Sequence, residues 1–311
     1  MKPVNTVFIG SSYEGKEILK TLHLSDKYKI TGVITQPDKP SGRKQELTPT
    51  EIKSTALELG IEIFEPNGDK EKYKKILEET KPKLIICIAF GEFIPKIVLE
   101  YPKYKCLNIH YSLLPELRGA CPVQAAIMRG NKKTGVTIQV MEEKMDVGPI
   151  LSQREVEISD DETTETLKEK LVPLGHDLLM KILPDWIDGE IEPQTQEKSN
   201  ATYCYLKDMS KEAAKINWEV EEPEEIERKI RALSSWPVAW TEVNSKRLKI
   251  FEAELVESNS DLKPGEITEI ESIPVVATNN PEKKLRLITV QLEGKNQMSG
   301  EDFFKGFREK V

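Results

Sequence analysis

Three side chains between residues 106 and 146 have the types and the spacing that acyl transfer requires. Asn108 and His110 lie two residues apart in the apolar run CLNIH, which predicts a strand, so both project from one face of it. An amide and an imidazole side by side donate hydrogen bonds well to an oxygen that gains negative charge. Asp146, in the turn sequence MDVG, would bring a carboxylate back to the histidine. The three residues therefore predict one pocket with an oxyanion site.

The segments between these residues predict the elements that position them. Ser112 to Pro115 reads as a tight loop after the first strand, and Arg118-Gly119 follows it. CPVQAAIMRG predicts a helix with Pro122 in its first turn, where the missing N–H of proline has no helical partner to lose. GVTIQVM predicts a second strand, and the loop after it ends at Asp146.

Strand and helix patterns alternate along the first 188 residues. NTVFIG, KITGVITQ and KPKLIICIAF are apolar runs of strand length, and segments with helical spacing separate them. Continuous apolar strands are typical of a parallel sheet that helices cover on both faces. The predicted fold class is α/β, with a doubly wound, mostly parallel, Rossmann-like domain. Ligands of such domains bind beyond the carboxyl ends of the strands, where Phe90 and His110 fall.

The C-terminal third has a different pattern. EIEPQTQEKSNATYC is polar and interrupted by proline, which is typical of a linker. After it, a charged helix precedes several short strands with turn signals and no helices between them, which favours a small β-barrel. We therefore expect a catalytic domain at residues 1–188, a linker at 189–206 and a smaller β-barrel domain at 207–311.

Charge and composition limit the partners. A formal net charge of −8 argues against a nucleic-acid binder with one broad basic surface. From Leu206 to Val311 the sequence has 17 Lys and Arg against 21 Asp and Glu. Any contact with RNA must therefore use local basic patches.

No segment of the sequence favours a membrane or a metal. The longest apolar run, LIICIAF, is much shorter than the ~20 residues of a membrane helix, and the N-terminus lacks a secretory signal. We expect a cytoplasmic protein that contacts no membrane. With three histidines and widely spaced cysteines, we expect no metal site. The thiols are expected to be buried and free, and they are Cys87, Cys106, Cys121 and Cys204.

Taken together, these motifs resemble the folate-dependent formyltransferases, and most closely the methionyl-tRNA formyltransferase group. The matching segments run in this order: Asn108-x-His110, Ser112-Leu-Leu-Pro115, Arg118-Gly119, Pro122-x-Gln124, Thr134-Gly-Val-Thr137 and Met145-Asp146-x-Gly148. Further similar segments follow toward the C-terminus: Thr202-Tyr203, Ile216-Asn-Trp218, Lys295 and Met298. The resemblance covers nearly the whole chain. It implies a formyltransferase domain followed by an OB-like β-barrel domain that supports tRNA binding.

The resemblance also implies the reaction and the roles of the three residues. A formyl group would pass from 10-formyltetrahydrofolate, the formyl-donor substrate, to the amino group of methionine on initiator tRNA, for translation initiation. Asn108 and His110 would stabilise the oxyanion, and Asp146 would take a proton and orient His110. No metal takes part. The implied partners are initiator methionyl-tRNA and folate, with no DNA, and we expect a monomer.

The same resemblance implies two further groups of residues. Folate would be bound by the pterin-side residues and by the loop after the first strand of the site: Ile88, Ala89, Phe90, Met141, Ser112, Leu113, Leu114 and Pro115. The tRNA would be contacted by Lys39, Arg43 and Lys44 in PDKPSGRKQELTP, a segment that composition alone would assign to a solvated loop.

Some assignments stay open at this point. Ser112 also reads as part of a mere turn, and Arg118 would face either substrate phosphate or carboxylate, or an ion-pair partner. Tyr111 stands where the family commonly has a small residue, so it is expected to narrow the pocket. Two alternatives keep the chemistry and change the acceptor: a nucleotide-sugar N-formyltransferase and a formyltetrahydrofolate hydrolase. A third alternative is a noncatalytic RNA-binding module.

Overall fold

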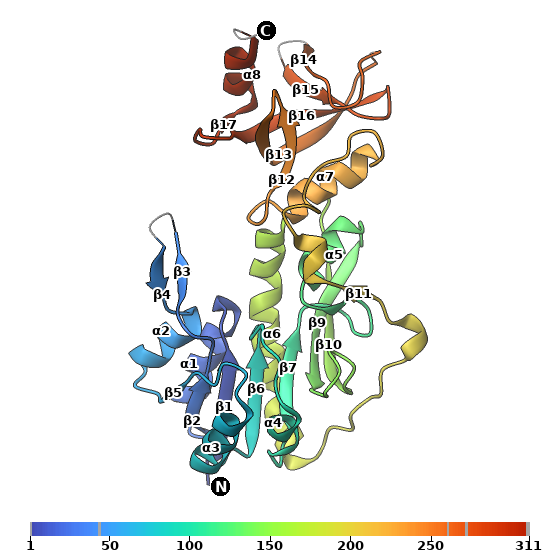
Figure 1. Cartoon of the computed structure of the whole chain (residues 1–311). Coiled ribbons are helices and arrows are strands. Elements are labelled where there is room, and N and C mark those ends of the chain that lie inside the picture. The colour runs from blue at the N-terminus through green and yellow to red at the C-terminus, as the bar shows by residue number, and fades with distance from the viewer. Residues whose placement is uncertain (1, 43–44, 260, 271–272, 309–311) are drawn as a thin grey trace. The chain divides into compact units, whose positions relative to one another are not determined.

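The computed structural model describes residues 2–42, 45–259, 261–270 and 273–308 (Figure 1). The chain forms two compact units. The first contains Met1–Gly119, Gly135–Glu155 and Leu171–Tyr203, and the second contains Ala120–Thr134, Val156–Lys170 and Cys204–Val311. None of the helices in the described residues is both long and apolar enough to cross a membrane.

A seven-stranded sheet forms the centre of the first unit, in the order β10-β9-β7-β6-β1-β2-β5. β1 is parallel to β2 and β6, β6 is parallel to β7, and β9 runs antiparallel to β7. The predicted mostly parallel sheet is therefore confirmed. The strands are β1 Val4–Gly10, β2 Tyr28–Ile34, β5 Ile63–Phe64, β6 Leu84–Ile88, β7 Cys106–His110, β9 Lys133–Val140 and β10 Ile150–Glu157.

Helices pack on both faces of this sheet, as expected for a doubly wound fold. Tyr73 of α3 and Val98 of α4 share a buried cluster with Ile9 and Cys106 on one face. On the other face, α6 approaches so closely that a side chain at Gly175 would meet Ile109 of β7 at 3.0 Å. The helices are α1 Lys16–Leu24, α2 Glu51–Glu58, α3 Lys70–Thr80, α4 Lys96–Glu100 and α6 Thr164–Asp188, with the 3-10 turns η1 Tyr13–Gly15 and η2 Lys198–Asn200.

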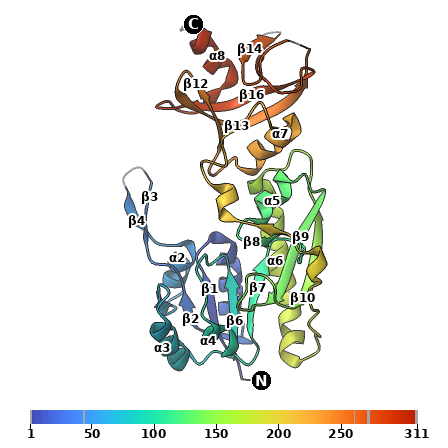
Figure 2. The same cartoon turned by 45° about the vertical axis from the view of Figure 1, so that its right-hand side comes forward.

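Two elements differ in detail from what the sequence suggested. The segment expected as a loop contains an antiparallel hairpin of β3, Lys39–Ser41, and β4, Glu46–Thr48. Figures 1 and 2 show that this hairpin projects on the side where β1 and β2 end. Helix α6 is a single helix, although Pro173 and Pro184, residues that usually end or kink a helix, lie inside it.

An antiparallel sheet in the order β12-β13-β16-β15-β14 forms the core of the second unit, with β17 beside β16 (Figure 2). Ile226 and Ile230 of α7 are buried against Leu248 and Ile250 of β13. A small OB-like β-barrel was predicted here, and the antiparallel sheet of the second unit is consistent with that prediction. Its elements are α5 Pro122–Met128, η3 Leu206–Met209, α7 Pro223–Ala232, β12 Ala239–Val243, β13 Lys246–Glu257, β14 Ile267–Ile270, β15 Ile273–Ala277, β16 Lys283–Leu292, β17 Met298–Ser299 and α8 Gly300–Arg308.

The four cysteines are buried and free, which confirms the prediction made for them. Pro122 lies in the first turn of α5, as predicted. A short pairing of β8, Arg118–Gly119, with β11, Tyr203–Cys204, completes the secondary structure.

Candidate active site

Asn108 and His110 lie on β7, as the alternation of the strand predicted. Cys106 of the same strand belongs to the buried cluster on the α3 and α4 face, so the residues two and four positions later share that face. In the antiparallel pairing with β9, Asn108 lies opposite Gln139 and His110 lies opposite Thr137. The sheet thus places the two donors next to the strand that leads to Asp146.

The carboxylate of Asp146 does return to the histidine. Asp146 Oδ2 lies 3.7 Å from His110 Nδ1, and the same oxygen accepts the backbone N–H of Gly119 at 2.8 Å. The other oxygen, Oδ1, accepts an N–H from the Gln139 amide at 2.8 Å. The Gln139 amide also lies 3.4 Å from Asn108 Oδ1. The three residues predicted from the sequence therefore meet in one site.

Hydrogen bonding fixes the tautomer of His110. Its side chain is buried, and Nε2 lies 2.9 Å from the carbonyl oxygen of Leu117. Because a carbonyl only accepts, Nε2 carries a proton in this arrangement. Nδ1 is the ring nitrogen that faces the carboxylate of Asp146, so a second proton on the ring would lie between the two groups.

Asn108 is fixed by its neighbours on β6. Its amide nitrogen donates to the backbone oxygen of Cys87 at 3.0 Å, and the amide also hydrogen-bonds the Cys87 thiol. Burial, together with the charge of Asp146, raises the pKa of that thiol to about 12. Cys87 is therefore a neutral neighbour of the site, and a sulfur is a weak hydrogen-bond acceptor that an oxyanion can replace.

Three residues with strained backbone lie next to these side chains in the chain or among their hydrogen-bond partners. Ala89, Leu117 and Asp146 have positive φ angles of 43°, 55° and 54°. Such angles are uncommon for residues other than glycine, and each costs on the order of 1 kcal/mol or more. A fold keeps this strain where the positions of particular groups matter, which is typical of active sites.

Two family models cover most of the chain. The formyl transferase model matches residues 4–183, and the model of the formyl transferase C-terminal domain matches residues 208–308. The chain belongs to the formyl transferase family. The resemblance identified from the sequence motifs is thus confirmed.

Curated relatives match this formyl transferase over nearly its full length. The methionyl-tRNA formyltransferase of Bacillus cytotoxicus is 41% identical over 305 residues, which are 97% of this chain and 96% of that protein. The methionyl-tRNA formyltransferase of Bacillus subtilis is 39% identical over 302 residues, or 96% of this chain and 94% of that protein.

Solved structures share the fold of this formyl transferase at low identity. An N-formyltransferase from Helicobacter canadensis, in complex with folinic acid and dTDP-3-aminofucose, has a TM-score of 0.67 and 19% identity, with 91% of this chain and 99% of that chain covered. HypX from Aquifex aeolicus, in complex with tetrahydrofolic acid, has a TM-score of 0.66 and 18% identity, with 99% of this chain and 48% of that chain covered.

The residues expected to hold folate lie in the segments after β6, β7 and β9. Ile88 ends β6, Ala89 is exposed and Phe90 is buried. Met141 follows β9, and its backbone N–H donates to Cys106 at 2.8 Å. In the loop after β7, Leu114 is buried, whereas Leu113 and Pro115 are half-buried.

Ser112 and Lys39 have partners inside the protein. The Ser112 hydroxyl donates to the backbone oxygen of Glu116 at 2.6 Å, so it stabilises its own loop. Lys39 is exposed on β3 and donates to Gln36 at 2.6 Å. Arg43 and Lys44, also expected to contact tRNA, lie outside the described residues.

The structure bears on two assignments that concern the site, those of Arg118 and Tyr111. Arg118 is buried, and its guanidinium donates to Gln196 at 2.7 and 3.0 Å and to the Tyr203 hydroxyl at 3.2 Å, so it supports the site from within. Tyr111 packs against α6, on the other face of the sheet from Cys106 and the α3 and α4 cluster. A side chain at Gly175 of α6 would meet Ile109 at 3.0 Å and the Tyr111 ring at 3.4 Å, so both residues lie on this face.

Gln139 and Gln196 are site residues that the sequence reasoning missed. Gln196 donates to the backbone oxygens of Asp146 and Gly148 at 2.9 and 2.7 Å. Gln139 could have been found as a candidate, because Thr137 and Gln139 are polar residues at alternate positions of a buried strand. No pattern marked Gln196, because it lies in a segment that reads as a linker.

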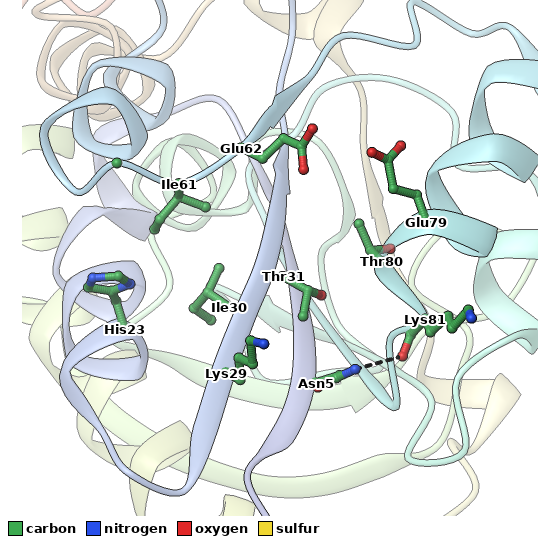
Figure 3. A pocket seen from close by; sticks show the side chains of 11 residues that line it. Asn5, His23, Lys29, Ile30, Thr31, Ile61, Glu62, Glu79, Thr80 and Lys81 are labelled. Atoms are coloured by element: carbon green, nitrogen blue, oxygen red, sulfur yellow. Dashed lines mark hydrogen bonds between the residues drawn. The ribbon is translucent and has the colours of Figure 1, made fainter.

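A cavity of about 430 Å³ lies elsewhere in the first unit, at the start of β2 (Figure 3). Asn5, Lys29 and Thr31 line it together with residues near the ends of α1 and α3, among them His23 and Lys81. It contains none of the predicted site residues. Within the part of the chain that the structure describes, no three His, Cys, Asp or Glu side chains are grouped to hold a metal.

Proposed function

We propose that this formyl transferase moves a formyl group from 10-formyltetrahydrofolate to the amino group of methionine esterified to initiator tRNA. The observation that carries the proposal is the identity of about 40% to methionyl-tRNA formyltransferases over nearly the full length of both chains. Solved structures of the same fold that contain tetrahydrofolic or folinic acid support a folate-derived donor. We place the reaction in the cytoplasm, where translation begins.

The chemistry begins with attack of the unprotonated amine on the formyl carbon. The new C–N bond turns the carbonyl oxygen into an oxyanion, and pre-positioned donors lower the free energy of that state. We assign this role to the Asn108 amide and to His110 with Nδ1 protonated. Nδ1 is the ring nitrogen that remains, because Nε2 is hydrogen-bonded to Leu117.

Collapse of this tetrahedral intermediate completes the transfer. The attacking nitrogen, now an ammonium, gives its proton to Asp146 directly or through a water. The bond from the formyl carbon to N10 then breaks, and the nitrogen takes up a proton as tetrahydrofolate leaves. Asp146 suits the role of base because the Gly119 and Gln139 N–H groups fix its carboxylate, with Oδ2 beside His110.

We assign folate binding to the residues after β6, β7 and β9, and tRNA contact to the β3–β4 hairpin with Lys39, Arg43 and Lys44. The support for the first group is its place in the chain, since Ala89 directly follows β6 and the loop from Ser112 to Pro115 follows His110. Lys39, Arg43 and Lys44 lie within six residues of the sequence, and this local positive charge on a chain of net charge −8 suits contact with phosphate.

The test is an acceptor comparison with 10-formyltetrahydrofolate as donor. We expect rapid formylation of initiator Met-tRNA, slow formylation of elongator Met-tRNA, and no formylation of an amino sugar nucleotide. Release of formate without an acceptor would instead indicate a hydrolase. Formylation of the sugar nucleotide but not of Met-tRNA would overturn the proposal.

A further inference from the structure

We propose that Gln139 is a positioning residue that holds the Asp146 carboxylate and the Asn108 amide in one fixed arrangement. The proposal rests on the proposed function, because it concerns the same reaction. Gln139 comes from β9, and only 1% of it is exposed. A buried amide has four hydrogen-bonding positions to satisfy, so its partners are part of the fold.

The direction of each hydrogen bond around Gln139 is forced by chemistry. A carboxylate only accepts, so the nitrogen of Gln139 must face Asp146 Oδ1, at 2.8 Å. The backbone oxygen of Cys87 also only accepts, so the nitrogen of Asn108 faces it and the oxygen of Asn108 faces Gln139, at 3.4 Å. One amide nitrogen therefore bridges the oxygens of both site residues.

The same logic continues on the other side of Gln139. Arg118 only donates, so the oxygen of Gln196 faces the guanidinium and the nitrogen of Gln196 faces the backbone oxygens of Asp146 and Gly148. The nitrogen of Gln196 also lies 3.5 Å from Gln139 Oε1. Rotating the Gln139 amide by half a turn would oppose its oxygen to the carboxylate, so the network has one stable arrangement.

This arrangement matters because the carboxylate would otherwise have freedom to turn. Asp146 lies on a loop with a strained backbone, and its Oδ2 is 3.7 Å from His110, beyond hydrogen-bond distance. The N–H groups of Gly119 and Gln139, one on each oxygen, therefore set its direction. Displacement of a reacting group by about 1 Å can lower a rate by roughly 10²-fold.

Two substitutions separate the donor from the volume of the side chain. Gln139→Met keeps the length and removes the N–H, and Gln139→Glu keeps the shape and replaces the N–H by a negative charge at neutral pH. We expect kcat to fall roughly 10- to 100-fold in the first and further in the second, with KM for the folate within twofold. Gln194→Met makes the same change at an exposed side chain and should leave both constants unchanged.

The pH dependence gives a readout that a merely structural role would not produce. When the carboxyl introduced by Gln139→Glu is protonated, its O–H can donate to Asp146 as the amide did. The ratio of its kcat to that of wild type should therefore rise at least fivefold from pH 8 to pH 6, whereas the ratio for Gln139→Met stays flat. The titratable and charged groups that face this position are Asp146, His110 and Cys87, with Arg118 acting through Gln196.

A second measurement keeps the inference testable even if no acceptor is formylated. The imidazole NMR signals of His110, which lies beside Asp146, should shift in Gln139→Met, while those of His23 and His176 stay in place. Unshifted His110 signals, or unchanged kcat in both variants, would overturn the inference and leave the proposed function standing. If wild type formylates no acceptor but the His110 signals still differ between wild type and Gln139→Met, the proposed function alone would be overturned.

Discussion

Asp146 is the residue on which the local geometry converges. Each of its oxygens accepts a backbone or side-chain N–H, and the imidazole of His110 lies beside one of them. Asn108 has a matching position, with its amide held by a backbone oxygen of β6. Both residues are fixed before any substrate binds, which is what electrostatic catalysis requires of its donors and bases.

At this scale we predict that Asn108→Ala and Asp146→Asn abolish most turnover while the protein stays folded. Loss of one oxyanion donor typically lowers kcat by roughly 10² to 10³. The second substitution also sets an amide N–H against the N–H of Gly119 or Gln139, since both oxygens of Asp146 accept. Formylation kinetics measure the loss, and circular dichroism checks the fold. Near-normal rates in either variant would refute the assignment.

The sequence pointed to the three proposed reacting groups, which the structure brings together, but not to the residues that hold them. Asn108, His110 and Asp146 could be found because chemistry limits which residue types act as donors and bases. Gln139 and Gln196 could not be recognised from the sequence as site residues, since a neutral amide acts here through partners that are distant in sequence. Arg118 was recognised as a motif residue, but its burial against Gln196 depends on a pairing 78 positions away in sequence.

Among the elements, the β3–β4 hairpin carries the proposed tRNA contact. We predict that Arg43→Ala lowers kcat/KM for Met-tRNA by about tenfold, because a guanidinium makes charge-assisted bonds to phosphate. Folate binding should change by less than twofold. Lys74→Ala, which removes one exposed positive charge on α3, is the matched control. A selective loss of folate affinity in Arg43→Ala would contradict this role for the hairpin.

The start of α6 gives a pH-dependent prediction. Burial raises the pKa of Glu162, but hydrogen bonds from Lys170 and Thr166 outweigh burial and hold the pKa below its ordinary value. The stability this gives is present above the pKa of the unfolded chain and is lost as pH falls through the lower folded value.

Wild type should therefore lose roughly 1 kcal/mol more stability than Glu162→Gln when the pH falls from 6 to 3.5. Urea unfolding at each pH measures the two free energies. Parallel losses in both proteins would show that the carboxylate does not contribute in this way.

Two elements show where sequence patterns fail to predict the secondary structure. β3 and β4 have three residues each and no apolar alternation, so PDKPSGRKQELTP reads as a loop. α6 continues past Pro173, although proline removes a helical hydrogen bond. Its Leu171, Leu178 and Leu179 are buried, and burial of that apolar side outweighs the local cost.

For the whole molecule, the net charge of −8 limits how tRNA is bound. We predict a shallow salt dependence, with a slope of roughly −2 to −4 for the logarithm of the association constant against that of the salt concentration. Such a slope corresponds to about two to five phosphate contacts. Filter binding at several salt concentrations measures it. A slope steeper than about −6 would indicate a broad basic surface that this composition does not suggest.

The division into a parallel α/β part and a small antiparallel part followed from periodicity, because burial on one or both faces imposes it. The structure of the stretch from Gly189 to Cys204 did not follow from periodicity, since its composition is typical of a flexible linker. In the structure, Gln194 bridges to Ile150 of β10, and Gln196 packs against Arg118.

That stretch has a practical consequence for protein engineering. A chimera spliced at residue 188 would discard Gln196, and with it two hydrogen bonds to Arg118 and two to the backbone oxygens of Asp146 and Gly148. A junction placed after Cys204 would retain Gln196 and its hydrogen bonds with Arg118. Chimeras that exchange the C-terminal region should therefore keep activity when the junction lies after residue 196 and lose it when the junction lies before residue 196.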